Sequence, residues 1–461
     1  MENELQKKYG LITAIAMVIG IVIGSGVFFK AEKVLVATGG DLPQGILAWG
    51  IGGVIMIVCA YVFAIMATRY EKVNGVVDYA EAALGVKYGY FVGWFMAVIY
   101  YPSITSVLAW VSARYTCVLL GWDIVGPEAM AISGFYLVGI YALNALSPKL
   151  AGKFQVSTTA IKLIPLVLMA VVGTIAGLRS GILVSNFTSG VIADVTSSNP
   201  LFTALVATAF AYEGWIIATS INAELIDAKK NLPKALTLGT LFVALIYILY
   251  YTGLAGAVEN SVIMQGGETG AKIAFSTVFS QVGGTVLFVF VVISCLGTLN
   301  GLMMGCTRGL FSLAARDLGP GPKVFKCIDA NTNMPTNSSV LGVLLTGAWL
   351  LYFYGANLVP TPWFGPFSFD SSELPIVTLY AMYIPIFIMM MVKEKSLNSY
   401  QRFLMPFVAI CACVFMVVAA CYAHGQAVAF YLIIFVVIMI IGILINSNKG
   451  FVNTQKDSLR G

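Results

Sequence analysis

The sequence predicts an all-α integral membrane protein with twelve transmembrane helices, and three observations support this fold class. Of its 461 residues, 59% are hydrophobic and only 10% are charged, whereas soluble globular chains carry about 25% charged residues. Twelve separate apolar runs approach the roughly 20 residues that a helix needs to cross a bilayer. The cations are concentrated in alternate connections. We therefore expect one transmembrane domain over residues 1–461.

The apolar runs follow one another with short connections, so no soluble domain interrupts them. An even number of spans places both termini on one side of the membrane. In chain order the expected spans are residues 11–29, 45–68, 88–120, 129–146, 156–178, 201–222, 235–257, 283–305, 338–357, 375–392, 403–423 and 425–446.

The basic residues indicate which side the termini occupy. Twenty of the 26 Lys and Arg residues fall in connections on the terminal side, and Lys162 lies within a span. The cations on the opposite side are Lys30, Lys33, Arg114, Arg179 and Lys272. Because cytoplasmic loops carry the excess of Lys and Arg, we expect both termini in the cytoplasm. The first span is too long for the apolar core of a cleavable signal peptide.

The composition also limits the chemistry. Histidine occurs once, at His424, in the tight external turn between the last two spans, where we expect it to be solvated. The eight cysteines are scattered without paired spacing, so they predict neither a disulfide framework nor a metal site. We expect no cofactor and no nucleic-acid partner.

The first span contains an interruption within Gly20–Phe29, which reads GIVIGSGVFF. Gly24, Ser25 and Gly26 fall together where a membrane helix should be continuous, and glycine allows the backbone to leave the helix. Freed backbone groups at bilayer depth need a cavity or a ligand. The break therefore suggests a binding site made of backbone, although small residues can also serve only close helix packing.

The sixth span carries a second interruption, at Phe210-Ala211-Tyr212-Glu213-Gly214-Trp215. Two units of five spans, residues 11–178 and 201–392, would each open with a broken helix and would be inverted relative to each other. Spans 11 and 12, residues 403–446, follow them. This five-plus-five inverted repeat is a transporter pattern, with the site at the midplane between the breaks.

Half-helix ends that meet at one point suit a zwitterion. Free N–H groups and partial positive charge at a helix N-terminus favour a carboxylate, here at the amides of Ser25, Gly26 and Val27. Free carbonyls at helix C-termini favour an ammonium, here near Ile23, Phe210 and Ala211. An α-amino acid carries both groups on one carbon, so the breaks predict an amino acid site.

GIVIGSGVFF, FAYEGW and the segment ELIDAKKNLPKA (224–235) together resemble the amino acid–polyamine–organocation (APC) superfamily. Within it the chain resembles the L-amino acid transporter (LAT) group and its bacterial serine/threonine exchangers. The resemblance implies a LeuT-like fold, alternating access and exchange of small neutral amino acids in a bacterial plasma membrane. It implies that Ile23–Gly26, Phe210, Ala211 and Glu213 line the substrate site, with Gly214 in the break. Phe210 would be an aromatic gate, and Trp215 would pack behind the break.

Lys162 lies within span 5, and a cation at such a depth is usually paired or functional. It could instead extend to the cytoplasmic interface, about two turns away. The resemblance implies that its ammonium stands where sodium binds in sodium-coupled relatives, bridging spans 1 and 5 through carbonyls of the broken helix. Transport would then be independent of sodium.

Glu213 is the other charge within the membrane. It could be protonated or hydrogen-bonded inside the bundle, form a polar wall for the substrate side chain, or bind a coupling proton. Family members place small residues or aspartate here, so glutamate leaves substrate size open. The rival functions are therefore a proton-coupled symporter and a permease for cationic amino acids or polyamines.

Several polar residues favour packing over substrate contact. Ser103 and Thr105 follow Pro102 in span 3 and are expected to bond back to their own helix. Span 8 contains a small-residue motif around Gly297. Tyr247 on span 7 could hydrogen-bond across the cavity, although a packed helix face is favoured. An intramembrane enzyme would need clustered His, Asp or Ser groups that the sequence lacks. The loop 121–128 has no cysteine, unlike animal relatives, so we expect no disulfide-linked heavy subunit.

Overall fold

The structure is a computed structural model that describes residues 10–70, 75–194, 199–217, 225–329, 331–332 and 334–446. Within these ranges the regular structure is helical and no strand occurs. Eleven helices are long and apolar enough to cross a membrane, and one further pair of shorter helices passes the same test together. The expectation of twelve spans is confirmed in the described part of the chain.

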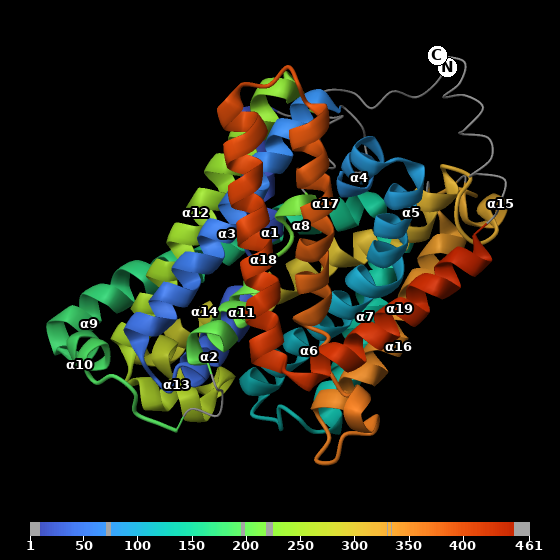
Figure 1. The fold of residues 1–461 in the computed structure, drawn as a ribbon. Helices are drawn as coiled ribbons and strands as arrows, with labels where there is room; N and C mark the ends of the chain where they lie inside the picture. The colour runs from blue at the N-terminus through green and yellow to red at the C-terminus, as the bar shows by residue number, and fades with distance from the viewer. Residues whose placement is uncertain are drawn as a thin grey trace.

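The first half of the chain contains five spans (Figure 1). Its first span is a pair of helices, α1 (Leu11–Val22) and α2 (Ser25–Ala37), bent by 47° at the break between them. The elements that follow are α3 (Leu42–Arg69), α4 (Val76–Leu84), α5 (Val86–Phe95), η1 (Met96–Tyr100), α6 (Tyr101–Leu120), α7 (Pro127–Leu146), α8 (Pro148–Leu168), η2 (Met169–Gly173), α9 (Thr174–Ser180) and α10 (Ile182–Thr188).

The second half supplies the other seven spans. Its elements are α11 (Pro200–Ala211), α12 (Ala228–Ala257), α13 (Asn260–Gly266), α14 (Glu268–Ala314), α15 (Pro322–Phe325), α16 (Thr336–Asn357), η4 (Gly365–Phe367), α17 (Leu374–Lys393), η5 (Tyr400–Leu404), α18 (Met405–His424) and α19 (Gln426–Ile445). The helix α14 extends well beyond the expected span 283–305. Non-helical backbone at Phe279 and Ser280 divides it.

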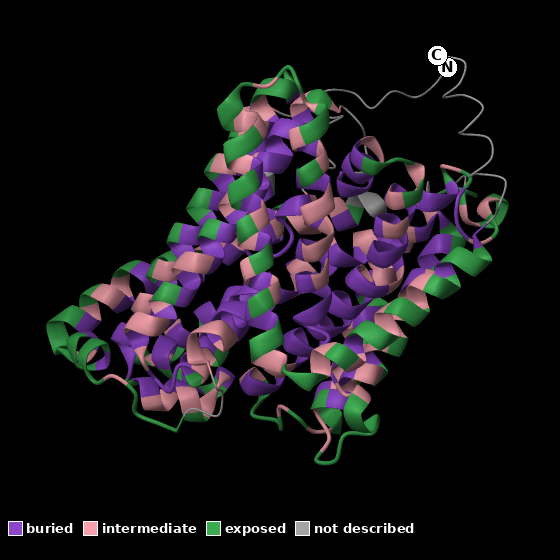
Figure 2. Ribbon diagram, viewed as in Figure 1, coloured by how far each residue is buried: buried purple, intermediate pink, exposed green. Residues whose placement is uncertain are grey.

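Burial separates the central helices from the outer ones. Figure 2 shows mostly buried residues along α2 and α11 and mixed, more exposed residues along α12, α18 and α19. Most of the α19 window that could span a membrane is unburied and strongly apolar. An exposed apolar surface of this size suits the hydrocarbon of a bilayer, where a helix can lie because its backbone groups are satisfied internally.

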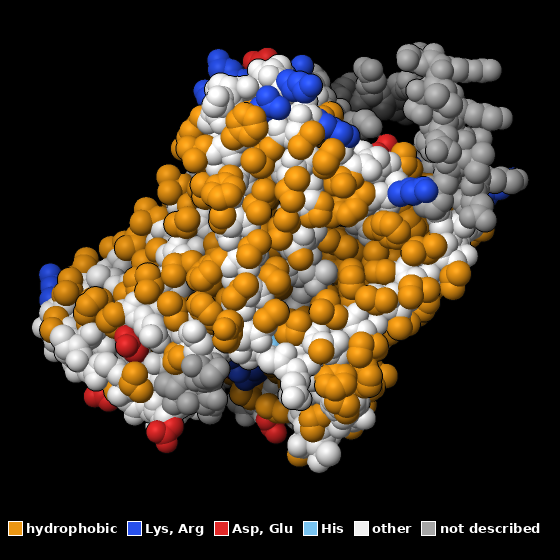
Figure 3. Space-filling model, in the orientation of Figure 1, with side chains coloured by type: hydrophobic (Ala, Val, Ile, Leu, Met, Phe, Trp, Pro, Cys, Tyr) orange, Lys and Arg blue, Asp and Glu red, His pale blue; other side chains and the backbone are white. Residues whose placement is uncertain are grey.

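On the face in Figure 3, the charged side chains lie mainly at the two ends of the molecule. Hydrophobic side chains form a broad belt on this face, and most Lys and Arg gather at the end that carries α4 and α15. The opposite end carries α10 and α13 and shows most of the acidic side chains of this face. Cations in this arrangement favour the α4 end as the cytoplasmic side.

Close glycine contacts join span 5 to span 7. Gly173 and Gly177 face Gly253 and Gly256 of α12, and a methyl group added at Gly256 would lie 2.5 Å from the carbonyl oxygen of Gly173. Small residues allow membrane helices to approach at backbone distance. The part of span 5 near η2 and the facing part of α12 therefore pack backbone against backbone.

Candidate functional site

The break in the first span occurs where the sequence predicted it. Helix α1 ends at Val22, and Ile23 takes an extended conformation with ψ 114°. Gly24 has φ −152° and ψ −147°, and α2 begins at Ser25. Thr298 of α14 fills the space where a side chain at Gly24 would stand. The backbone leaves the helix at a residue that has no room for a Cβ.

The second break lies at the end of α11. This helix ends at Ala211, and residues 212–214 form a turn before a short 3₁₀ segment at 215–217. Gly214 has φ 106°, a conformation that glycine adopts without strain. The last part of the expected span, 218–222, lies outside the described residues.

The two breaks are in contact with each other. A methyl group on Gly26 would lie 2.5 Å from the Cα of Ala211 and 3.2 Å from the carbonyl oxygen of Phe210. One on Gly214 would lie 3.2 Å from the carbonyl oxygen of Ile21. The N-terminal turn of α2 therefore meets the C-terminal turn of α11. The positive pole of one helix dipole faces the negative pole of another at this point.

Tyr247 of α12 holds both breaks together. Its hydroxyl lies 3.1 Å from the carbonyl oxygen of Val22 and 3.2 Å from that of Ala211. Its single proton is thus shared between a carbonyl in the last turn of α1 and one in the last turn of α11. Of the two readings of Tyr247, the favoured one, packing alone, was wrong, because apolar periodicity cannot show where a buried hydroxyl points.

Lys162 of α8 holds the end of α1 from another side. It is fully buried, and its Nζ donates hydrogen bonds to the carbonyl oxygens of Gly20 and Ile23. The alternative in which it extends to the interface is wrong. The expected bridge between spans 1 and 5 through carbonyls of the broken helix is confirmed as geometry.

These contacts correct one detail of the predicted ammonium site. The Ile23 carbonyl already accepts a hydrogen bond from Lys162, and the Ala211 carbonyl already accepts one from Tyr247. A carbonyl oxygen has two lone pairs, so an arriving ammonium can share these acceptors. It would not find them free.

Comparison with known proteins identifies the family. The family model described as "Amino acid permease" matches residues 9–444. The chain belongs to the amino acid permease family. The APC and LAT resemblance drawn from the motifs is confirmed.

The curated relatives include both bacterial and animal transporters. The chain is 28% identical over 416 residues to the serine/threonine exchanger SteT of Bacillus subtilis (strain 168), covering 89% of this chain and 90% of that protein. It is 26% identical to the b(0,+)-type amino acid transporter 1 of Mus musculus, over 77% of this chain and 69% of that protein. The cystine/glutamate transporter of Homo sapiens is 24% identical, over 72% and 65% respectively.

Aromatic rings cover one side of the two breaks in this permease. Phe210 is buried and stands edge-on to Phe29 of α2, with ring centroids 6.0 Å apart. Phe29 also meets Trp110 of α6 edge-on at 5.9 Å. Beside the break, the Ser25 hydroxyl is buried and has no hydrogen-bond partner among the described residues. Val27 is fully buried in the first turn of α2.

Glu213 lies in the turn that follows α11. Its Oε1 accepts a hydrogen bond from the Tyr100 hydroxyl of η1, on span 3. Its Oε2 is buried and has no partner among the described residues. Tyr383 of α17 stands close enough to interact with the carboxyl group. The expectation of a hydrogen-bonded carboxyl within the bundle is confirmed for one oxygen only.

The remaining sequence candidates serve packing. Trp215 is fully buried, and its ring meets that of Tyr383 at 5.9 Å. The Ser103 and Thr105 hydroxyls donate to the carbonyls of Tyr100 and Tyr101, as expected for bonds back to their own helix. In α14, Gly297 packs against Thr158 and Asn300 bonds to Asn144.

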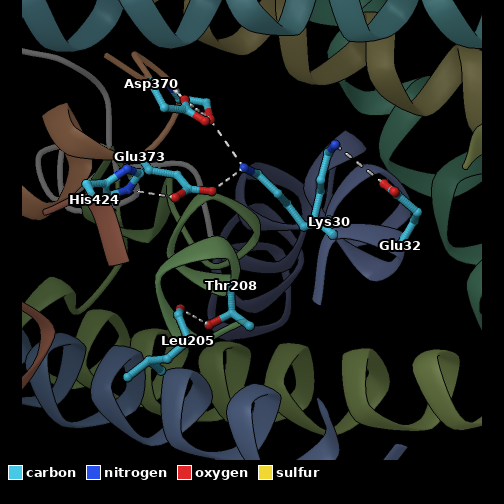
Figure 4. Close-up of polar contacts among 9 residues, drawn as sticks. Lys30, Glu32, Leu205, Thr208, Asp370, Glu373 and His424 are labelled. Carbon is cyan, nitrogen blue, oxygen red and sulfur yellow. Dashed lines mark hydrogen bonds and ion pairs between the residues drawn. The ribbon is translucent and has the colours of Figure 1, made fainter. Parts of the chain in front are cut away.

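The sequence did not predict a cluster of charged side chains that lies next to the rings of Phe29 and Phe210. Lys30 of α2 forms an ion pair with Glu373, the residue just before α17, and His424 at the end of α18 bonds to the same carboxylate (Figure 4). The side chain of His424 is only 15% exposed, so the expectation of a solvated histidine was wrong. Lys30 is 2% exposed rather than a loop cation. These residues lie far apart in sequence, and no motif links them.

Proposed function

We propose that this protein exchanges small neutral L-amino acids, such as serine, threonine or alanine, across a bacterial plasma (inner) membrane. The observation that carries the proposal is the contact between the N-terminal turn of α2 and the C-terminal turn of α11, at Gly26 and Ala211. Opposite backbone poles at one point favour a ligand with a carboxylate and an ammonium on neighbouring atoms. The similarity to the serine/threonine exchanger SteT, which covers 90% of that protein, supports the substrate class.

The substrate carboxylate would bind the N–H groups of Ser25, Gly26 and Val27, with Gly24 giving the backbone room to turn. The ammonium would bind near Phe210 and Ala211 and share the latter carbonyl with Tyr247. The buried, unpartnered Ser25 hydroxyl adds a donor and acceptor beside the carboxylate position. Glu213 and Gly214 would form the wall on the far side of α11.

Transport would proceed by alternating access between two inverted repeats, residues 11–178 and 201–392, with residues 403–446 outside them. In this arrangement the broken helices α1–α2 and α11 rock against the helices around them, and the site is exposed to each side in turn. The concentration of Lys and Arg at the α4 end supports cytoplasmic termini.

Lys162 makes this transport independent of sodium in our proposal. Its ammonium supplies a positive charge to the Gly20 and Ile23 carbonyls at the broken end of α1. A metal cation bound to the same carbonyls would be repelled by this charge. Amino acid uptake should therefore be the same when sodium is replaced by choline.

Purified protein in proteoliposomes tests the proposal directly. Vesicles loaded with serine should take up labelled serine rapidly, whereas empty vesicles should take up little, with or without a pH gradient. A panel of unlabelled amino acids then defines the substrate by competition. Equal uptake into loaded and empty vesicles would rule out exchange, and conductance without saturation would indicate a channel.

Proton-coupled symport is the second candidate, because Glu213 has one buried oxygen without a partner. A carboxyl group in this position could bind a proton on one side and release it on the other. Symport predicts uptake into empty vesicles that increases with an inward proton gradient. The same assay therefore distinguishes the two mechanisms.

The proposal also includes the absence of catalysis and the absence of a disulfide-linked partner. The protein would act as a transporter without catalysing a reaction, as the names of its relatives indicate for them. It would work without a disulfide-linked heavy subunit, since Cys117 is buried within α6 rather than placed in the loop that follows. Mass measurement under non-reducing conditions checks the second point.

A further inference from the structure

We propose that Lys30, Glu373 and His424 form an outer gate, and that its ion pair breaks each time the site opens toward the side opposite the termini. The inference rests on the transport function proposed above. Lys30 would be a gating residue, because it would control access to the site without touching the bound amino acid.

The ion pair joins two elements beside the two breaks. Lys30 Nζ lies 2.6 Å from Glu373 Oε1 and 3.2 Å from the Ser372 hydroxyl. Lys30 comes from α2, which is the second half of the broken span, whereas Glu373 lies at the start of α17. The side chains are 3% and 11% exposed, so little water reaches the pair. As long as this contact persists, α2 cannot move away from the start of α17.

The position of the ammonium links the pair to the candidate site. Lys30 Nζ lies 5.2 Å from the ring centroid of Phe210 and 5.2 Å from that of Phe29. Both rings border the contact between α2 and α11. The ion pair thus covers the aromatic side of the breaks. A substrate that passes Phe210 and Phe29 on its way out must first displace Lys30 from Glu373.

A third element extends the cluster beyond the expected repeats. His424 Nε2, at the end of α18, lies 3.0 Å from Glu373 Oε2, so each carboxylate oxygen has its own partner. Asp370 holds Ser372 through the backbone amide and the hydroxyl of that serine. Glu32 lies on the other side of α2, away from Glu373, and pairs with Lys33 (Figure 4).

The charges facing one another in the cluster are therefore Lys30, Glu373, His424 and Asp370. Burial alone would raise the pKa of the Glu373 carboxyl group, but Lys30 and the hydrogen-bonded His424 lower it to about 2. The carboxylate therefore stays ionised at any pH at which the protein works. The pair is held by charge in the closed state.

An ion pair in this position can act as a reversible gate. In the closed state each charge compensates the other inside the protein, and in the open state water would hydrate both. Removal of one partner leaves a buried charge without compensation in the closed state only. A single neutral substitution should therefore shift the equilibrium toward the state open to the outside.

The first test uses intact cells that express Lys30→Met or Glu373→Gln, with Lys33→Met as the matched control. Lys33 lies on the same helix, and its side chain is 47% exposed. For the two gate variants we expect the maximal exchange rate and the external KM to fall together, each by roughly tenfold. The control should keep both values.

A purely structural role gives a different result. Misfolding lowers the amount of active protein, which reduces the maximal rate at unchanged external KM. The charge exchange Lys30→Glu with Glu373→Lys should restore both parameters toward wild type if the attraction matters. Unchanged KM in both single variants, without rescue in the double variant, would overturn the gate.

A cross-link provides the second test. The double variant Lys30→Cys with Glu373→Cys, treated with a short bifunctional thiosulfonate, should lose exchange and regain it after reduction. Each single cysteine variant, treated in the same way, should keep its activity. Exchange that continues through the cross-linked protein would contradict the gate. Absence of exchange in the untreated wild type would instead contradict the proposed function, so the two failures are distinguishable.

Discussion

Two buried lysines stabilise the first span, and their partners differ. Lys162 contacts backbone carbonyls of the broken end of α1, at Gly20 and Ile23. Lys30 contacts a side-chain carboxylate on a different element, Glu373 at the start of α17. Carbonyls of a helix end cannot leave without moving the helix itself, whereas a carboxylate pair separates when two elements move apart and water enters.

This difference assigns the two halves of the span different tasks. The half before the break is anchored by Lys162 and by Tyr247, and both contacts involve main-chain oxygens. The half after the break is held on its outer side by an ion pair that depends on charge. We expect loss of an inner contact to damage the site itself, and loss of an outer contact to change only access to it.

The largest effect should follow Lys162→Met. Two buried carbonyl groups lose their donor, and each unsatisfied group costs about 1–3 kcal/mol. Exchange measured in proteoliposomes should fall by more than about tenfold. Serine binding, measured by a thermal-shift assay, should fall to a similar extent. Lys153→Met on the exposed side of the same helix is the control. Near-normal serine binding in Lys162→Met would show that Lys162 is not needed to hold the broken end of α1.

A smaller loss should follow Tyr247→Phe. This change removes one hydroxyl shared by Val22 and Ala211 and keeps the ring, so the cost is about 0.5–1.5 kcal/mol. The KM for serine should increase by roughly two- to tenfold. Tyr251→Phe on the same helix is the matched control, because the Tyr251 hydroxyl has no partner among the described residues. Equal effects of both substitutions would argue against a specific role for Tyr247.

A still smaller effect on serine exchange is expected for Glu213→Gln. Glutamine keeps an oxygen that can accept from Tyr100, so the rate should stay within about threefold of wild type. Uptake of lysine, measured beside that of serine, shows whether the charge selects substrates. Unchanged uptake of both amino acids would remove Glu213 from the site. Loss of gradient-driven uptake would favour symport.

The smallest effect concerns pH and the Glu373 pair. The pKa of this carboxyl group is about 2, below the ordinary 4.5, so the pair contributes stability above pH 4.5 that is lost as the pH falls toward 2. The difference in melting temperature between wild type and Glu373→Gln should not shrink from about pH 8 to pH 6, and it should grow as His424 gains a proton beside the carboxylate. It should shrink below pH 4.5.

The same series in a His424→Gln background removes the titration of the imidazole. There the difference in melting temperature should stay constant from about pH 8 to pH 6. A difference that already shrinks near neutral pH in this background would mean that Glu373 is not held ionised by Lys30.

The sequence predicted the spans and the breaks because both depend on local composition. Apolar runs of about 20 residues define spans, and the small residues Gly24 to Gly26 define the first break. Lys162 was recognisable as a charge in an apolar segment, and the family resemblance supplied its carbonyl partners. These features can be read within a short stretch of chain or from a known relative.

Contacts between distant side chains could not be predicted in the same way. Lys30 and Glu373 are 343 residues apart, and His424 is another 51 residues away. In the sequence, Lys30 and His424 look like ordinary residues of external connections, because burial of a polar group depends on the tertiary fold. The hydroxyl of Tyr247 is a similar case, since its direction depends on where α1 and α11 end.

The glycine contacts between span 5 and span 7 have a consequence for both inner anchors. Lys162 lies on α8, which continues into η2 and Gly173, and Tyr247 lies on α12 with Gly253 and Gly256. Helices that touch at main-chain distance have little freedom to slide, so the two anchors belong to one stiff frame. A single methyl group at Gly256 would push α12 away from span 5. The hydrogen bonds from Lys162 and from Tyr247 to α1 would then both weaken.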